Sequence, residues 1–391
     1  MTMTLVRLRE ASIYAIAAAL TVLAAVVYTL SLPEVRYEEV SLPLQFRYEY
    51  LEEYYKPEWA RWTDVKSYPP TAFVEGVPWI SYEKPYCAST CLQMIAYKYG
   101  INASVGYLNF LMGFTYGAYY GEFDGQAFFT PFNDPFAGYV NASRLLGLEY
   151  HLLVMNDEEL FESLCRYLVS RDVPVVLPVN ASRLYGASHF TPHFELLVGY
   201  DEEFFYLYEP TGPTKFLLGE RGLRFPASLV VKAVNDLCRG FQLPWKYALM
   251  YFTRGARPSI NLAEVLRRNG LLELGFNYTF GSYRMFLGST AISALAERIE
   301  RGGLTGQEIA WQLKAASLTR LDNAGFLRLC FPKEEGVAKA AEYLEAAARS
   351  YEEALHIIST SPLKAAALLR RAAQYEAEAG RLLVAAGEGG D

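Results

Sequence analysis

Residues 77–100, VPWISYEKPYCASTCLQMIAYKYG, decide the fold class of this chain. Pro85 and Tyr86 lead into Cys87, and the apolar side chains that follow recur at helical spacing. We therefore predict a helix that begins at Cys87 and stops at Gly100. The free N–H groups of its first turn favour a thiolate, the attacking form of a cysteine. Cys87 is thus the candidate nucleophile.

A second block, PHFELLVGYDEEFFYLYEPTG at residues 192–212, predicts a β-hairpin. The first strand begins at His193, the acidic run 201–203 forms the turn, and the second strand ends at Glu209. The hairpin returns Glu209 to the end of the sheet where His193 lies, so the carboxylate can accept the ring N–H. Glu195, on the same strand face as His193, is a weaker substitute. We predict His193 as the base and Glu209 as its orienting acid.

The two blocks resemble the cysteine and histidine blocks of papain-like C39-type peptidases, in which the hairpin usually ends in Asp-Pro. The chain is more similar to the butirosin-biosynthesis protein H family, whose N-terminal domain resembles that peptidase fold and precedes a helical domain. The positions Cys87, Thr90, Tyr99 and Gly100 match the cysteine block of that family. This resemblance implies an α+β, papain-like cysteine-enzyme domain.

The resemblance covers about residues 76–385 and is specific only in the two blocks. The stretch FLMGFTYGAYYGEFDG is similar to a glycine- and aromatic-rich segment of the family. A second segment of the family, an apolar strand followed by a Tyr and two His, is similar to the stretch before the hairpin. The segments GSTAISALAERIERGG and LDNAGFLRL resemble the second domain more loosely.

The resemblance implies a Cys-His-Asp triad that takes an acyl group as a thioester and passes it to water or to an amine. Cys87 matches the nucleophile and His193 the base, while Glu209 occupies the Asp position with one extra methylene. The peptidases also place a Gln about six residues before the cysteine to build the oxyanion hole, and this sequence has Ser81 there. Ser81, a nearby tyrosine or the backbone N–H of Cys87 must serve instead, or activity is low.

The N-terminal region predicts a membrane anchor. Residues 11–32 carry no charge and are long enough to cross a bilayer. The apolar run is too long for a signal peptide and continues to Pro33, which favours a retained anchor over a cleaved signal. Positive charge precedes the run, so residues 1–10 are expected in the cytoplasm and the catalytic domain outside the cell membrane.

Four N-glycosylation sequons agree with an exported protein, although a triplet this short also arises by chance. We expect each of them on a surface loop of a glycoprotein. The four asparagines are Asn102, Asn141, Asn180 and Asn277.

The chain has five cysteines, an odd number that leaves at least one thiol unpaired in an oxidising compartment. Cys91 lies one helical turn from Cys87 and is expected to be a buried apolar side chain. The pairing of Cys165, Cys238 and Cys330 stays open. With no CxxC pair and four scattered histidines, the sequence predicts neither a metal site nor a cofactor.

Three other features bear on partners and substrates. The formal net charge is −7 without a run of Lys and Arg, which argues against nucleic acid. The glycine- and tyrosine-rich stretch 114–129 is read equally as an aromatic substrate rim or as a packed loop. His189 is more simply incidental than part of the cleft, and His151 and His356 have no chemical neighbours in sequence.

Composition divides the chain beyond the anchor into a stalk at 33–75, the papain-like domain at 76–260 and a helical bundle at 261–391. Two amphipathic helices end the bundle, with Ser361 capping the second and Pro362 at its first position. The bundle is expected to serve as a lid or a protein-binding surface.

These features together predict a membrane-anchored cysteine hydrolase that cleaves a peptide or amide bond through a thioester on Cys87. One alternative is an acyltransferase to an amine, as the closer family implies. The other is a catalytically inactive papain-like fold used for binding, which the Ser81 and Glu209 positions favour.

Overall fold

The computed structural model describes residues 55–123, 126–186, 190–212, 222–258, 260–280, 283–304 and 306–389. The predicted anchor at 11–32, the first part of the stalk and His189 lie outside the described residues. No helix within the described ranges is long and apolar enough to cross a membrane.

The first layer of the protein is a mixed eight-stranded sheet with the order β1-β5-β10-β6-β7-β8-β9, and β2 pairs with β7. Its pairs are antiparallel except that β1 runs parallel to β5. The strands are β1 (Pro57–Trp59), β2 (Ala72–Phe73), β5 (Leu148–Met155), β6 (Val175–Asn180), β7 (Pro192–Tyr200), β8 (Phe204–Tyr208), β9 (Leu223–Pro226) and β10 (Tyr247–Arg254). The second part of the predicted stalk thus supplies two short strands of this sheet.

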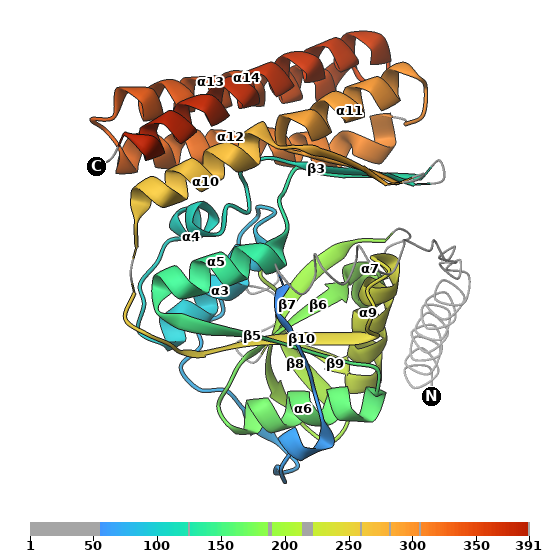
Figure 1. Cartoon of the computed structure of the whole chain (residues 1–391). Coiled ribbons are helices and arrows are strands. Elements are labelled where there is room, and N and C mark those ends of the chain that lie inside the picture. The colour runs from blue at the N-terminus through green and yellow to red at the C-terminus, as the bar shows by residue number, and fades with distance from the viewer. Residues whose placement is uncertain are drawn as a thin grey trace, which may run out of the picture.

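Helices cover both faces of the sheet (Figure 1). Phe252 of β10 contacts Tyr139 of α5, whereas Tyr247, five residues away and so on the opposite face, contacts Phe161 of α6. Strand β10 is therefore buried on both sides. The elements of this layer are η1 (Trp62–Asp64), α3 (Cys87–Lys98), α4 (Val105–Met112), α5 (Pro135–Leu146), α6 (Glu158–Ser170), α7 (Ala181–Tyr185) and α9 (Ala227–Gly240).

A second layer joins a small antiparallel sheet to a bundle of long helices, which lie together at the top of Figure 1. The sheet has the order β11-β12-β3-β4. Its strands are β3 (Tyr119–Phe123), β4 (Gln126–Thr130), β11 (Asn277–Phe280) and β12 (Tyr283–Leu287). The helices are α10 (Leu262–Leu274), α11 (Gly288–Glu300), α12 (Gly306–Cys330), α13 (Glu335–Ile357) and α14 (Pro362–Glu388).

The second layer differs from the predicted division of the chain at residue 260. Strands β11 and β12 lie inside the predicted helical region, and β12 pairs with β3, which comes from the predicted papain-like region together with β4. The aromatic stretch 114–129 is therefore a hairpin of the second layer. The last two helices lie where the sequence predicts them, with Ser361 at the N-cap and Pro362 in the first turn, although the Ser361 side chain makes no capping bond.

A fully buried arginine holds the parts of the second layer together. Arg320 of α12 donates to both carboxylate oxygens of Glu376 at 2.7 and 3.0 Å, and to the carbonyls of Thr115, Gly117 and Pro131 at 2.6–3.1 Å. These carbonyls lie on both sides of the β3–β4 hairpin. Arg320 therefore fixes the hairpin against α12 and α14.

Glu273 of α10 is fully buried beside this pair, and burial and the Glu376 charge raise its pKa well above the ordinary value, against the opposite effect of Arg320. The folded state thus holds a proton that the unfolded state releases near pH 4.3, so its stability contribution falls as pH rises through the raised pKa. We expect Glu273→Gln, which keeps the neutral shape, to unfold at the same or a higher temperature at pH 7. Thermal unfolding at pH 5 and pH 8 should show a smaller pH dependence in the variant, and an unchanged dependence would contradict this assignment.

Candidate active site

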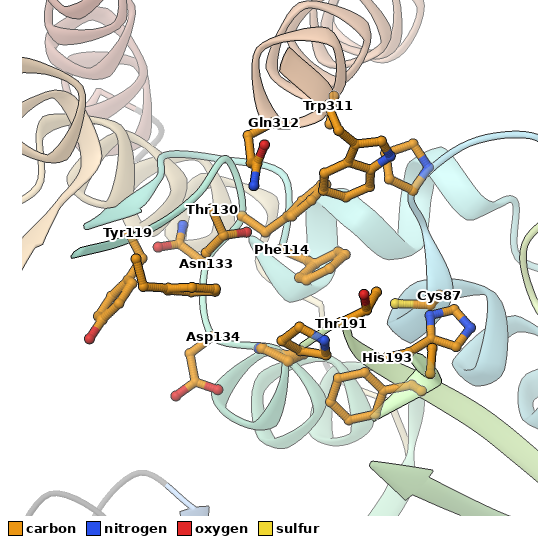
Figure 2. A pocket seen from close by; sticks show the side chains of 18 of the residues that line it. Cys87, Phe114, Tyr119, Thr130, Asn133, Asp134, Thr191, His193, Trp311 and Gln312 are labelled. Carbon is orange, nitrogen blue, oxygen red and sulfur yellow. The ribbon is translucent and has the colours of Figure 1, made fainter. Parts of the chain in front are cut away.

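The nucleophile candidate begins a helix, as the sequence predicts. Helix α3 starts at Cys87, and its N-cap residue, Tyr86, makes no side-chain capping bond. The first backbone N–H groups of α3 thus point toward the thiol without a capping side chain. Cys87 is partly exposed, and Figure 2 shows its sulfur beside the His193 ring.

The predicted hairpin is confirmed and brings the acid to the base. Strands β7 and β8 are joined by a turn in which the Asp201 carboxylate accepts the N–H groups of Glu203 and Phe204 at 3.0 and 2.8 Å. Because Leu196 pairs with Tyr208, Glu209 returns to the end of β7 that carries His193.

His193 and Glu209 form a buried hydrogen-bonded pair. The His193 Nε2 atom lies 2.9 Å from Glu209 Oε1, and the two side chains are almost inaccessible to solvent. Burial raises the pKa of Glu209, but His193 and other hydrogen-bond donors lower it to about 2. Since an ionised carboxylate only accepts, Nε2 must donate to it, which leaves Nδ1 for the sulfur.

The charge of His193 is set by its two partners. Burial lowers its pKa, yet the Glu209 carboxylate and the Cys87 sulfur, which also hydrogen-bonds to the ring, raise it well above the ordinary value. An imidazolium is therefore favoured between Glu209 and Cys87 at neutral pH. This arrangement suits a thiolate–imidazolium pair, the attacking form of a cysteine nucleophile.

Two residues for which the sequence analysis predicts no role hold Glu209 in place. The Thr211 backbone N–H and hydroxyl donate to Glu209 Oε1 at 2.7 and 2.8 Å. The Tyr185 hydroxyl lies 2.8 Å from Glu209 Oε2 and 2.5 Å from Glu195 Oε1. Glu209 thus has a fixed orientation in spite of its extra methylene.

Glu195 does not replace Glu209 as the partner of His193. Its carboxyl lies 3.8 Å from His193 Nε2, and burial and the neighbouring Glu209 charge raise its pKa well above the ordinary value. A hydrogen bond between the two carboxyls raises the pKa of Glu195 and lowers that of Glu209, so a protonated Glu195 donates to the ionised Glu209. Glu195 therefore acts directly on the acid and not on the His193 ring.

His193, Glu195 and Glu209 also offer atoms that lie within 4.8 Å of one another, a spacing at which a metal ion can be held. The proton on Glu195 and the Tyr185 hydroxyl would compete with a cation there, and a cation would displace the bond between His193 and Glu209. The donor set therefore fits a shared proton better than a metal.

We expect Glu209→Gln to lower turnover by about 10³-fold or more, because an amide no longer stabilises the imidazolium and no longer fixes its tautomer. Glu209→Asp is the matched control, since it restores the charge with a shorter reach and should keep more activity than Gln. Turnover and thermal unfolding measured on both variants check this. Equal activity of Gln and the wild type in a folded protein would remove Glu209 from the triad.

The predicted oxyanion role of Ser81 is not supported by its position. Its hydroxyl donates to the Gly212 carbonyl, and Ser81 does not line the cleft beside Cys87. The hydroxyls of the nearby Tyr82 and Tyr86 donate to Gln93 and Asp322. Of the donors considered from the sequence, the backbone N–H of Cys87 is the one that remains for an oxyanion.

A cleft of about 1450 Å³ opens at Cys87 and His193 and runs between the two layers. The first layer contributes Phe136, Phe190 and Phe241 to its walls. The second layer contributes side chains of β3, β4, β12 and α12, which include Tyr119, Phe128, Phe129, Met285, Leu287 and Trp311. Part of the aromatic stretch 114–129 therefore forms a rim of the cleft.

The four sequons do not all lie on surface loops. Asn102 and Asn277 are exposed, the latter at the start of β11, and Asn141 lies within α5. Asn180 is only 2% exposed, and its side-chain oxygen accepts the N–H groups of Ser182 and Thr191. A glycan on Asn180 would break this cap and is incompatible with the fold, which corrects the expectation for that site.

Among the described residues, the other cysteines and histidines discussed from the sequence lie outside the cleft. All five cysteines are free thiols, and Cys91 is buried against the Phe194 carbonyl as expected. His151 stacks on Tyr251 at the edge of the sheet, away from the cleft. His356 ends α13 and does not line the cleft.

No protein-family model matches the chain, and a search of curated proteins finds no match. Among solved structures, the chain matches a crystal structure from Bacillus anthracis provisionally described as a C39-like peptidase, with 17% sequence identity and a TM-score of 0.32. The match covers 48% of this chain and 100% of that chain. The likeness to butirosin-biosynthesis protein H therefore stays a prediction, and the function proposed for the chain rests on the geometry of its site.

Proposed function

We propose that the protein is a cysteine hydrolase of papain-like architecture that cleaves an amide bond through a thioester on Cys87. The observation that carries the proposal is the chain of contacts from the Cys87 sulfur through the His193 ring to the Glu209 carboxylate. These side chains come from the start of a helix and the two strands of one hairpin, and they open into a large cleft.

The reaction proceeds in two steps. The Cys87 thiolate attacks the carbonyl carbon of the amide, and the His193 imidazolium gives its proton to the leaving amine as the C–N bond breaks. Water then attacks the thioester, His193 takes a proton from that water, and the C–S bond breaks. The products are a carboxylic acid and an amine, and the thiolate–imidazolium pair is restored. The Cys87 backbone N–H stabilises the oxyanion in both steps.

The test is to trap the thioester. The full chain is mixed with an activated ester, quenched in acid and analysed by intact-mass and peptide-mass spectrometry. We expect one acyl group on Cys87 that decays with time, and no acyl group on this position in His193→Ala. Absence of an acyl-enzyme under any condition would favour the inactive binding protein instead.

Acyl transfer to an amine is the second candidate, because the cleft is larger than the usual ligand site of about 300–1,000 Å³ and has room for an acceptor. Decay of the trapped thioester is compared with and without added amines. Faster decay that yields an amide product would assign the transferase reaction, and decay to the free acid alone would assign the hydrolase.

We further propose that the enzyme works outside the cell membrane on an anchor formed by residues 11–32, a proposal supported by the sequence pattern alone. Protease treatment of intact cells that express the full chain tests this. Cleavage of the catalytic domain in intact cells is expected, and full protection until the cells are broken would contradict it.

A further inference from the structure

We propose that the cleft binds the apolar acyl group of the substrate, so that the enzyme acts on amides or esters of long-chain apolar acids. This inference rests on the proposed acyl transfer through Cys87. It concerns the part of the substrate that the catalytic residues do not touch.

A row of aromatic rings leads away from the catalytic sulfur. Phe114 stacks on Phe132 with ring centroids 4.9 Å apart, and Phe132 contacts Trp311 of α12 at 6.4 Å. Figure 2 shows Phe114 and Trp311 facing the same space as Cys87. Both ends of the row line the cleft, so an extended apolar chain bonded to the sulfur can lie along it.

A second group of aromatic rings also lines the cleft. Phe128 of β4 packs edge-on against Phe241, which follows α9, with ring centroids 5.9 Å apart, and Phe190 packs on Phe241 at 5.5 Å. Phe128 belongs to the second layer, and Phe190 and Phe241 belong to the first. The second layer thereby completes a site that the first layer alone leaves open.

The charged groups deep in the cleft are already engaged within the protein. The Asp134 carboxylate caps α5 by accepting the Phe136 N–H at 2.9 Å, and Glu209 binds His193. The other charged side chains of the lining, Glu83, Lys84, Glu308 and Lys314, lie on exposed loop and helix surfaces at the rim, and Lys84 pairs with Asp322. A charged acyl group would therefore lose its hydration in the cleft without gaining a buried partner of opposite charge.

Two large apolar side chains at this site are exposed. Trp311 is 59% exposed and Phe241 is 41% exposed, and both line the cleft. An apolar ligand that covers such surface in a concave site beside a nucleophile gains binding free energy from its burial. The exposed rings mark the outer end of the acyl site.

The experiment measures kcat/KM for p-nitrophenyl esters of acetate, octanoate and suberate, the last a chain of octanoate length that ends in a carboxylate. Each value is corrected with Cys87→Ala as the blank, at concentrations below micelle formation. Since each buried methylene contributes about 0.8 kcal/mol, about six more of them should raise kcat/KM for octanoate about 100-fold or more over acetate. Suberate should gain far less than octanoate.

Variants locate the site on the aromatic row. Trp311→Ala should lower kcat/KM for octanoate about 10-fold more than it lowers kcat/KM for acetate, and Phe241→Ala should act in the same direction. Leu329→Ala is the matched control, because Leu329 lies on the same helix, is 80% exposed and does not line the cleft. It should change neither ester.

Failure of this inference is distinguishable from failure of the proposed function. If all three esters acylate Cys87 at similar rates, or if Trp311→Ala lowers acetate and octanoate equally, the apolar acyl site is refuted and the nucleophile stands. If no ester acylates Cys87, and alkylation of Cys87 by iodoacetamide does not depend on His193, both proposals fall.

Discussion

Cys87→Ala is expected to abolish turnover, with a loss of at least about 10⁴-fold, while the protein stays folded. The alanine removes the sulfur that forms the thioester and leaves helix α3 intact, because alanine favours a helix and Cys87 is partly exposed. Turnover of an activated ester and thermal unfolding measured together check this expectation.

Cys91→Ala is the matched control for this substitution. Cys91 lies on the same helix but is fully buried, and it does not line the cleft. Its alanine variant should lose some stability and keep its turnover per folded molecule. Turnover that survives in Cys87→Ala, or that disappears equally in folded Cys91→Ala, would contradict the assignment of the nucleophile.

Arg320→Met is expected to cost about 3–5 kcal/mol of folding free energy, the usual cost of removing one partner of a buried ion pair. The change leaves the Glu376 carboxylate without its guanidinium and three backbone carbonyls around the β3–β4 hairpin without their donor. Because that hairpin forms a wall of the cleft, the variant should also lose its preference for octanoate. Denaturant unfolding gives the free energy.

Two control substitutions test whether the loss of folding free energy comes from the burial of the ion pair. Arg370→Met removes the partner of Glu300 on the exposed surface and should cost no more than about 1 kcal/mol. Arg320→Met combined with Glu376→Leu replaces both ends of the buried pair and should recover part of the loss. A loss for Arg320→Met no larger than that for Arg370→Met would show that Arg320 does not hold the β3–β4 hairpin against α12 and α14.

The local structure around the candidate catalytic residues could be predicted because it depends on neighbours in sequence. Helical spacing after Cys87 and the turn at 201–203 fix a helix start and a hairpin register, and the register places Glu209 beside His193. The strand of His193 and the helix of Cys87 lie far apart in sequence. Their meeting was inferred from the resemblance, and the structure supplies the contact.

The parts that sequence reasoning missed depend on contacts between distant segments. Ser81 loses its predicted role because its hydroxyl meets the Gly212 carbonyl, which no local pattern reveals. Tyr185 ends a short helix, and only the folded sheet brings its hydroxyl to two carboxyls. The sequence signal for Tyr185 was its place in the segment that leads to the His193 strand.

The walls of the cleft could not be predicted from the sequence, because they too depend on contacts between distant segments. Strands β11 and β12 are short, and the stretch that follows β11 begins with glycine, so the pairing of β12 with β3 cannot be predicted from local spacing. Trp311 lies on α12, whose other face packs in the bundle. Arg320 lies on the same helix, and its contacts hold α12 in the position that places Trp311 over the cleft. A lid or binding bundle was expected, and the structure makes one of its helices a wall of the active-site cleft.

The most direct test of the Cys87–His193–Glu209 triad is the rate of Cys87 alkylation by iodoacetamide at pH 6 and at pH 9, in the wild type and in His193→Ala. An ordinary thiol with a pKa of about 8.5 is less than about 1% ionised at pH 6. The raised pKa of His193 keeps an imidazolium beside the sulfur at this pH. We predict that the wild type reacts about 100-fold faster than His193→Ala at pH 6 and that the two rates converge at pH 9. Equal rates at both pH values would contradict the triad.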